Sequence, residues 1–177
     1  MKTSKNPTSA DNQQERSKTY LRGYIAGLVD GEGSFHVAFA IREDLAIKVF
    51  PIPEFHISQN KESIQVLELA REIFGCGYIK ANHQNSPDKT YVYVAKDKHD
   101  LVTKVLPFFE YNPLYTTKRN DYMLFAQITK MIINGHHRTI EGMIDIIELA
   151  YQMNGAGKRR QRSKEELIQI LKSSETI

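Results

Sequence analysis

Three glycines spaced four residues apart constrain the fold of this chain more than any other feature. Gly23, Gly27 and Gly31 lie in and just before the segment YIAGLVDGEGSF, and they fall on one stripe of a helix. Each glycine inside a helix costs about 1 kcal/mol relative to alanine. Small residues also let a second backbone approach closely. We therefore expect another helix to pack against this stripe, with Ala26 and Asp30 beside it.

Two acids, Asp30 and Glu32, lie where this helix should end. Unpaired carboxylates are unfavourable there, because the C-terminus of a helix carries partial negative charge. Residues advance by about 100° around a helix, so the two side chains lie about 200° apart unless the chain unwinds at Gly31–Gly33. A divalent cation would reverse the unfavourable interaction, and two Glu32 carboxylates meeting at a helix seam would suit Mg²⁺. The plain alternative is a glycine-rich turn with Glu32 in solvent.

The composition is that of one soluble domain with tails. Of the 177 residues, 41% are hydrophobic and 25% are charged. No apolar run approaches the ~20 residues that cross a bilayer, and the N-terminal segment lacks the apolar stretch of a signal peptide. We therefore expect a disordered tail over 1–18, a single domain over 19–177, no membrane partner and an intracellular location, cytoplasmic or organellar. The lone Cys76 excludes an internal disulfide, and the net charge of +3 is compatible with a polyanionic partner.

Hydrophobic periodicity predicts the order α-β-β-α-β-β-α, followed by further helices. Prolines are expected to interrupt the second strand and to end the third helix. A capping box, Ser163–Glu166, opens the last helix. The expected helices cover about 19–31, 61–74, 99–107, 116–137, 139–154 and the segment after 163. The expected strands cover 34–42, 46–59, 77–83 and 90–96, with a turn at 84–89.

The segment IAGLVDGEG, from Ile25 to Gly33, resembles the LAGLIDADG motif of homing endonucleases. The later segments PEFHISQ, GYIKA, LPFFEYNPL and TKRNDYMLF are similar to further landmarks of that family, so the resemblance covers roughly residues 20–172. Glu32 departs from the aspartate in the motif's name, which keeps a carboxylate but changes its reach. The resemblance implies an α+β fold: an αββαββα half with a saddle-shaped antiparallel sheet and additional C-terminal helices.

The same resemblance implies a site-specific double-strand DNA endonuclease that uses Mg²⁺, with Mn²⁺ as a substitute, and leaves 3′ overhangs. In this family the sheet lies in the major groove and the motif helix joins two halves. Because this chain has one motif, it is expected to act as a homodimer on a long, near-palindromic site. Two alternatives use the same fold: a maturase with intron RNA as partner, and a catalytically inactive DNA-binding protein. The retained carboxylate of Glu32 disfavours the inactive protein.

The resemblance also assigns catalytic roles. Glu32 is expected to bind the metal together with Gly31. Gln59 matches a glutamine that positions water near the metal, although a hydrogen bond at the strand end would explain it equally. Lys118 matches a basic residue near the scissile phosphate, and Arg119 is the alternative for that role.

The expected DNA contacts come from alternate strand residues, because the major groove admits a two-stranded ribbon whose side chains reach base edges. The basic run KRRQR at 158–162 is expected to touch phosphates, which adds affinity without reading sequence. Each of these side chains could also lie on a merely solvated surface. In the strand 90–96, the sequence does not decide which alternating set of residues faces the core, the set that includes Val92 or the set that includes Tyr93. The expected contacts are Ser34, His36, Arg42, His56, Ser58, Tyr78, Lys80, Asn82, Lys158, Arg159 and Arg160.

Overall fold

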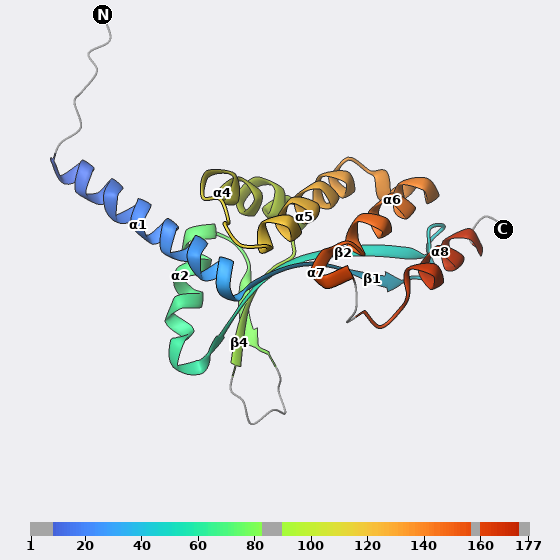
Figure 1. Ribbon diagram of the computed structural model, residues 1–177, viewed down its shortest axis with the longest axis horizontal. Helices are drawn as coiled ribbons and strands as arrows, with labels where there is room; N and C mark the ends of the chain where they lie inside the picture. The colour runs from blue at the N-terminus through green and yellow to red at the C-terminus, as the bar shows by residue number, and fades with distance from the viewer. Residues whose placement is uncertain (1–8, 83–89, 157–159, 174–177) are drawn as a thin grey trace, which may run out of the picture.

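A four-stranded antiparallel sheet, with strand order β1-β2-β4-β3, forms the centre of the molecule in the computed structural model (Figure 1). The model describes residues 9–82, 90–156 and 160–173. Helices α4, α5 and α6 lie over one face of the curved sheet. Within the described residues, no helix has the length and apolar character needed to cross a membrane.

The expected order of elements and the α+β fold class are both confirmed, including the additional C-terminal helices. The expected turn at 84–89 lies outside the described residues. The strands are β1 (Gly33–Ile41), β2 (Val49–Asn60), β3 (Tyr78–Ala81) and β4 (Thr90–Ala95). The helices are α1 (Ser9–Glu32), η1 (Lys61–Ser63), α2 (Ile64–Phe74), α3 (Lys98–Asp100), η2 (Leu101–Val105), α4 (Leu106–Tyr111), α5 (Lys118–Ile133), η3 (His136–Arg138), α6 (Ile140–Ala150), α7 (Met153–Ala156) and α8 (Lys164–Lys172).

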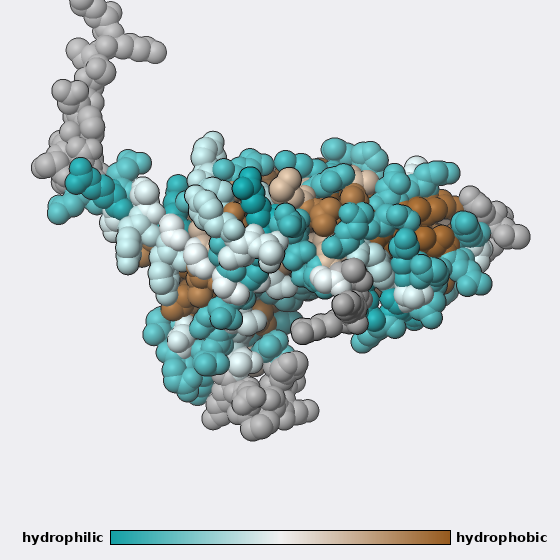
Figure 2. All heavy atoms as spheres, viewed as in Figure 1, coloured by the Kyte–Doolittle hydropathy of each residue, from teal (hydrophilic) through white to brown (hydrophobic). Residues whose placement is uncertain are grey.

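Helix α1 begins well before the expected start near Thr19. Its first residue is Ser9, so the part of the expected disordered tail that the structure describes, residues 9–18, is helical. This part projects from the body in Figure 1 and in Figure 2, and its side chains over residues 15–18 are exposed. Only the C-terminal part is anchored, by the fully buried Ile25 and Val29. The segment contains good helix formers but no apolar stripe, which is why periodicity did not indicate it.

Strand β2 runs without a break through Pro51 and Pro53, where an interruption was expected. Both prolines pair with β1, whereas β4 pairs only with the later part of β2, from Phe55 onward. The prolines therefore lie where β2 has a neighbour on one side only. Their missing N–H groups can face the open side without breaking the ladder.

The helix expected to end at Pro107 continues through it. The turn before the proline, η2, is a π-helix in which the Leu106 amide donates to the Leu101 carbonyl. In a regular helix the proline ring clashes with the carbonyl four residues earlier, and a wider turn relieves that clash. The break expected at Pro113 is confirmed, because α4 ends at Tyr111 and α5 begins at Lys118.

An aromatic cluster fills the space between the sheet and the helices. The Phe35 and Phe55 rings stack with centroids 4.9 Å apart, and Phe109 meets both of them edge-on. Tyr93 is fully buried in this core, which settles the competing parities of β4. The valines on the opposite parity of β4 are nevertheless buried on the open face of the sheet.

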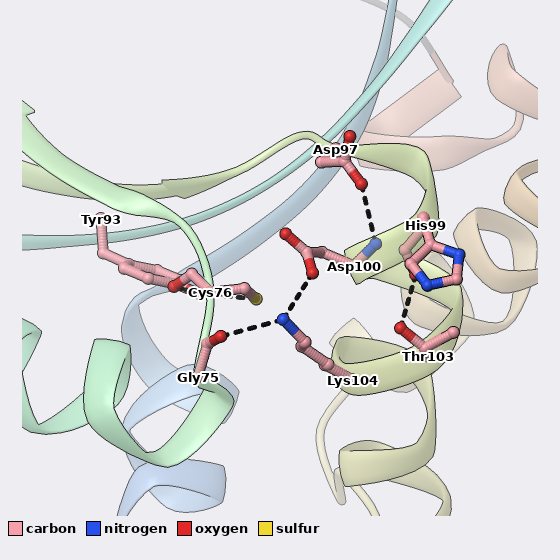
Figure 3. A network of polar contacts seen from close by, with 8 residues as sticks. All are labelled: Gly75, Cys76, Tyr93, Asp97, His99, Asp100, Thr103 and Lys104. Carbon is pink, nitrogen blue, oxygen red and sulfur yellow. Dashed lines mark hydrogen bonds and ion pairs between the residues drawn. The ribbon is translucent and has the colours of Figure 1, made fainter.

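A polar network holds the end of α2 against the π-helical turn (Figure 3). Gly75 caps α2 in the left-handed region at φ 61°, where glycine is favoured. The Lys104 ammonium donates to the Gly75 carbonyl at 3.0 Å and pairs with Asp100 at 2.6 Å. The Tyr93 hydroxyl donates to the Cys76 carbonyl at 3.1 Å. These bonds fix the connection from α2 to the sheet.

Candidate active site and nucleic-acid interface

The end of α1 and the start of β1 form a tight corner. The helix continues through Glu32, so its two acids point in different directions, and Gly31 and Glu32 are both exposed. Gly33 opens β1 in a buried position. A Cβ added there would lie 2.6 Å from the Val29 side chain and 2.8 Å from its carbonyl oxygen, so the corner requires glycine. The corner presents the Glu32 carboxylate to solvent at the edge of the sheet.

Asp30 turns toward the loop before α5 of its own chain. Its carboxylate accepts hydrogen bonds from the Tyr115 amide at 2.8 Å, the Thr116 amide at 3.1 Å and the Thr116 hydroxyl at 2.6 Å. Burial alone would raise the pKa of Asp30, but these hydrogen bonds and the Lys118 charge outweigh it and lower the pKa. No local pattern indicated this partnership, because its two halves lie far apart in the chain. The expected place of Asp30 in a helix seam stays a prediction.

The Asp30 loop positions Lys118, the residue expected beside the scissile phosphate. The Lys118 ammonium donates to the Gly31 carbonyl at 3.0 Å. Burial lowers the pKa of Lys118, while the charges of Asp30, Glu32 and Asp121 act in the opposite direction. The structure thus brings Glu32, Gly31 and Lys118 together at one corner. Arg119, the alternative, lies beside Lys118 in the first turn of α5 and is exposed.

Gln59 lies near the end of β2, two residues beyond the pairing of Gly33 with Ile57, on the side where α1 ends. Its side chain is partly buried. Within the described residues the side-chain amide of Gln59 makes no hydrogen bond. The alternative role of Gln59, a hydrogen bond that ends the strand, is therefore not supported there. The role of Gln59 as a water-positioning residue stays a prediction.

The Asp30 hydrogen bonds give stability a pH dependence. Because the folded pKa of Asp30 is lowered, its stabilising effect is complete above the unfolded pKa and is lost as the pH falls through the folded value. We expect Asp30→Ala to lower the free energy of unfolding at neutral pH, with a difference from wild type that shrinks toward about pH 3. Urea unfolding of both proteins across this range measures it. A difference that does not change with pH would contradict the assignment.

The strand register gathers most of the expected DNA contacts on one open face of the sheet. Ser34 pairs with His56, which pairs with Val94, which pairs with Tyr78, so these four side chains form one row across all four strands. Ser58, Val92 and Lys80 form a second row. Arg42 lies just beyond β1 and Asn82 just beyond β3, and both are exposed. Lys158 and Arg159 lie outside the described residues.

Two histidines and one acid meet on this face. A single Glu54 carboxylate oxygen lies 3.0 Å from His56 Nε2 and 3.3 Å from His36 Nε2. Burial is the main cause that lowers the pKa of His36 and brings that of His56 to about 4, against the opposing charge of Glu54. Both rings are therefore neutral at pH 7. The alternating pattern predicted the two histidines, whereas their meeting at Glu54 needed the register.

Arg160 is engaged within its own chain, and its expected phosphate contact stays a prediction. Its guanidinium donates to the Val37 carbonyl at 2.6 Å and to the Ala150 carbonyl at 2.8 Å, and it stacks on the Phe39 and Tyr151 rings. It therefore ties α6 to the edge of β1, because two carbonyls and two rings in its own chain engage it. Asn154 covers the same edge by donating to the Phe35 carbonyl at 2.9 Å.

We expect Arg160→Ala to destabilise the fold by about 2–3 kcal/mol, the scale of hydrogen bonds made by a charged group. The neighbouring Arg162 is exposed, and its alanine variant is the matched control that should leave stability unchanged. Thermal and urea unfolding measure both. Equal stability of the two variants would show that the tether of Arg160 is not needed.

The face of α1 that is expected to form a helix seam carries both buried and exposed residues, and the seam itself stays a prediction. Ala26 is 9% exposed and packs in the core of its own chain, since it lies one residue from Ile25 and three from Val29. Gly23 and Gly27 are exposed, and a Cβ added at either would meet nothing within 4 Å. Tyr20 and Tyr24, at 73% and 44% exposure, lie on the same helix.

Comparison with known proteins gives the family. A model described as LAGLIDADG endonuclease matches residues 25–129, well over half of the chain, and this span includes the α1 corner and Lys118. The chain belongs to the LAGLIDADG endonuclease family. This LAGLIDADG chain is 29% identical over 161 residues to "Homing endonuclease I-ApeII" of Aeropyrum pernix, a match that covers 89% of the chain and 93% of the relative.

Two solved structures extend the comparison. The archaeal intron-encoded homing endonuclease I-Vdi141I, complexed with DNA, superposes with a TM-score of 0.79 at 28% identity, covering 89% of this LAGLIDADG chain and 98% of the other. The homing endonuclease I-LtrWI, bound to target DNA, superposes with a TM-score of 0.76 at 31% identity. That match covers 84% of this chain but 49% of I-LtrWI, so this chain corresponds to about half of that protein.

Proposed function

We propose that this chain is a homodimeric homing endonuclease that cleaves both strands of a long, near-palindromic DNA site with Mg²⁺. The observation that carries the proposal is the corner where Glu32 and Lys118 meet, between an exposed glycine face and an open sheet face. The DNA-bound structures of I-Vdi141I and I-LtrWI support DNA as the partner.

The homodimer is supported by glycines that the single chain does not explain. Among the described residues, a Cβ at Gly23 or Gly27 meets nothing within 4 Å beyond the local backbone of its own helix, and alanine would favour the helix by about 1 kcal/mol at each position. A second helix packed on this face would explain the glycines, because its backbone could approach closely only where side chains are absent. The match to about half of I-LtrWI supports the same arrangement, with two chains in place of one longer chain.

The donors at the corner fit Mg²⁺, with Mn²⁺ as a substitute. Glu32 and the Gly31 carbonyl offer oxygen ligands, which hard cations prefer. A carbonyl oxygen has two lone pairs, so Gly31 can accept the Lys118 hydrogen bond and still face an ion. Such an ion, when bound, supplies charge neutralisation and an activated water. The two Glu32 carboxylates of the dimer then serve one strand each.

The side chains around the corner have separate tasks in this proposal. Lys118 places a positive charge beside the scissile phosphate, which stabilises the charge that develops during hydrolysis. Gln59 orients the attacking water. Asp30 binds no metal and instead positions Lys118 by holding the loop before α5.

Selection from a library of random duplex DNA tests the function. The purified protein is incubated with the library and Mg²⁺, and the cut ends are captured and sequenced, with Glu32→Gln as the matched control. We expect enrichment of one long site with two related halves and 3′ overhangs for the wild type only. Enrichment of a site without two-fold symmetry, or of nothing, would contradict the proposal.

The open sheet face should read bases. We expect Lys80→Ala to relax sequence preference at a few base pairs, by about 1–3 kcal/mol at those positions. Lys130→Ala removes the same charge from α5, on the covered side of the sheet, and should leave the preference unchanged. Binding to all single-base variants of the selected site measures the effect. A uniform loss across all sequences would instead make Lys80 a phosphate contact.

A further inference from the structure

The cluster of His36, Glu54 and His56 has no part in the proposed cleavage reaction. It lies on the open face of the sheet, on the paired strands β1 and β2, whereas the Glu32 corner lies where α1 ends. The three side chains are partly exposed, at 30%, 22% and 23%. The two imidazole rings lie 4.5 Å apart between centroids and meet edge to face. The cluster is therefore a second group of potential ligands, apart from the first.

The two spacings between the Glu54 oxygen and the histidine nitrogens are close to those of a metal site. In a tetrahedral site with bonds of 2.0–2.1 Å, two donors lie about 3.3 Å apart. The two nitrogen-to-oxygen distances here are 3.0 and 3.3 Å, and the three donor atoms all lie within 4.8 Å of one another. We propose that His36, Glu54 and His56 bind one transition-metal ion of the Zn²⁺ type, on the sheet face, separate from the Glu32 corner.

The donor types favour such an ion over Mg²⁺. Imidazole nitrogens suit Zn²⁺, Co²⁺ and Ni²⁺, while Mg²⁺ prefers oxygen ligands. A metal binds imidazole through a ring nitrogen that carries no proton. Without the ion, the Glu54 carboxylate oxygen accepts a hydrogen bond from His56 Nε2 and lies 3.3 Å from His36 Nε2. Binding replaces these contacts, moves the ring protons to Nδ1 and needs little movement of the three side chains.

The three side chains are partly exposed on the open face of the sheet, so a further ligand can reach an ion held there. Among the residues that the structure describes, three protein donors converge, which is the pattern of sites that keep one position for water or another ligand. With respect to DNA this placement rests on the proposed function, in which the ion would add positive charge to the groove-facing surface. The metal site itself does not depend on DNA.

Two positively charged side chains near the cluster, Lys80 and Arg160, should weaken metal binding. The charge of Lys80 acts on His56, and that of Arg160 acts on His36. Both repel a bound dication, and Glu54 offsets part of that repulsion. Removal of the Lys80 charge should therefore tighten metal binding, whereas loss of any of the three ligands should weaken it.

Calorimetric titration of the DNA-free protein with Zn²⁺, in excess Mg²⁺ to occupy hard oxygen sites, tests the proposal. We expect one Zn²⁺ per chain for wild type, and at least about tenfold weaker binding for His56→Ala and Glu54→Gln, since loss of even a supporting partner costs that much. Circular dichroism confirms that each variant is folded. Titration with Co²⁺ should give the visible absorption of a four- or five-coordinate ion.

Three further variants separate this site from Zn²⁺ binding at a surface histidine or at the Glu32 corner. His99→Ala removes an exposed histidine elsewhere and should not change binding, Glu32→Gln should bind Zn²⁺ as wild type does, and Lys80→Ala should bind more tightly. Absence of stoichiometric Zn²⁺, or undiminished binding in a folded His56→Ala variant, would overturn the proposal. Because DNA is absent, failure of the proposed nuclease function would leave the Zn²⁺ result unchanged.

Discussion

Glu32→Gln is expected to abolish DNA cleavage, by about a thousandfold or more, while DNA binding stays nearly intact. The substitution keeps the size of the side chain but removes the charge that holds the cation. Loss of a metal's several kcal/mol of transition-state stabilisation corresponds to a rate effect of this size. Relief of repulsion between the carboxylate and the phosphates could only tighten binding. Cleavage in Mg²⁺ and gel shifts in Ca²⁺, on the same selected site, measure the two effects separately.

Asp30→Asn tests whether the effect of Glu32→Gln is specific to the acid that is proposed to bind the metal. Asp30 is bonded to Tyr115 and Thr116, so its substitution should loosen the Lys118 loop and reduce cleavage without abolishing metal dependence. If Glu32→Gln cleaves at nearly the wild-type rate, the metal assignment is wrong, and an RNA maturase or a DNA-binding regulator becomes the better description.

Gly27→Leu is expected to convert the dimer to a monomer. The leucine side chain has free space in the single chain, where a Cβ at this position meets nothing within 4 Å, so the fold should remain intact. In a seam of two helices it would separate the backbones and remove the close contact. Sedimentation at micromolar concentration measures the change, and specific DNA binding should fall with it.

Ser17→Leu is the matched control for this variant. Ser17 is exposed on the projecting part of the same helix, outside the glycine stripe, and it gains the same side chain. We expect it to remain dimeric. A wild-type chain that sediments as a monomer with no dimer on DNA, or a dimeric Gly27→Leu, would exclude the seam.

Local patterns predicted the elements of this fold well, and they failed where distant contacts decide. The alternation of β1 and β2 indicated which residues face the core, and the Ser163–Glu166 capping box is present in the structure. The start of α1 was wrong because its projecting part has no apolar stripe. The end at Pro107 was wrong because a π-helical turn before the proline accommodates the ring.

In the candidate site too, residues in local motifs could be predicted from the sequence, whereas contacts between distant residues could not. Glu32 and Lys118 could be predicted from the motif and its later landmark, because each lies in a recognisable segment. The bonds of Asp30 to Thr116 and of Arg160 to Val37 join residues far apart in sequence, and no pattern along the chain indicates such a pair. The same holds for the meeting of two histidines at Glu54, which follows only from the strand register.

In the proposed function, the two faces of the sheet allow target recognition to change independently of the fold. Along β1 and β2 most odd-numbered residues build the core, whereas the polar even-numbered ones lie on the open face: Ser34, His36, Glu54, His56 and Ser58. A substitution at one of these polar positions removes little buried apolar area, so most replacements there should cost less than about 0.5 kcal/mol of stability. Such a surface can acquire new base contacts one residue at a time as its DNA target drifts. The same property makes these positions the natural choice for redirecting the protein to another sequence.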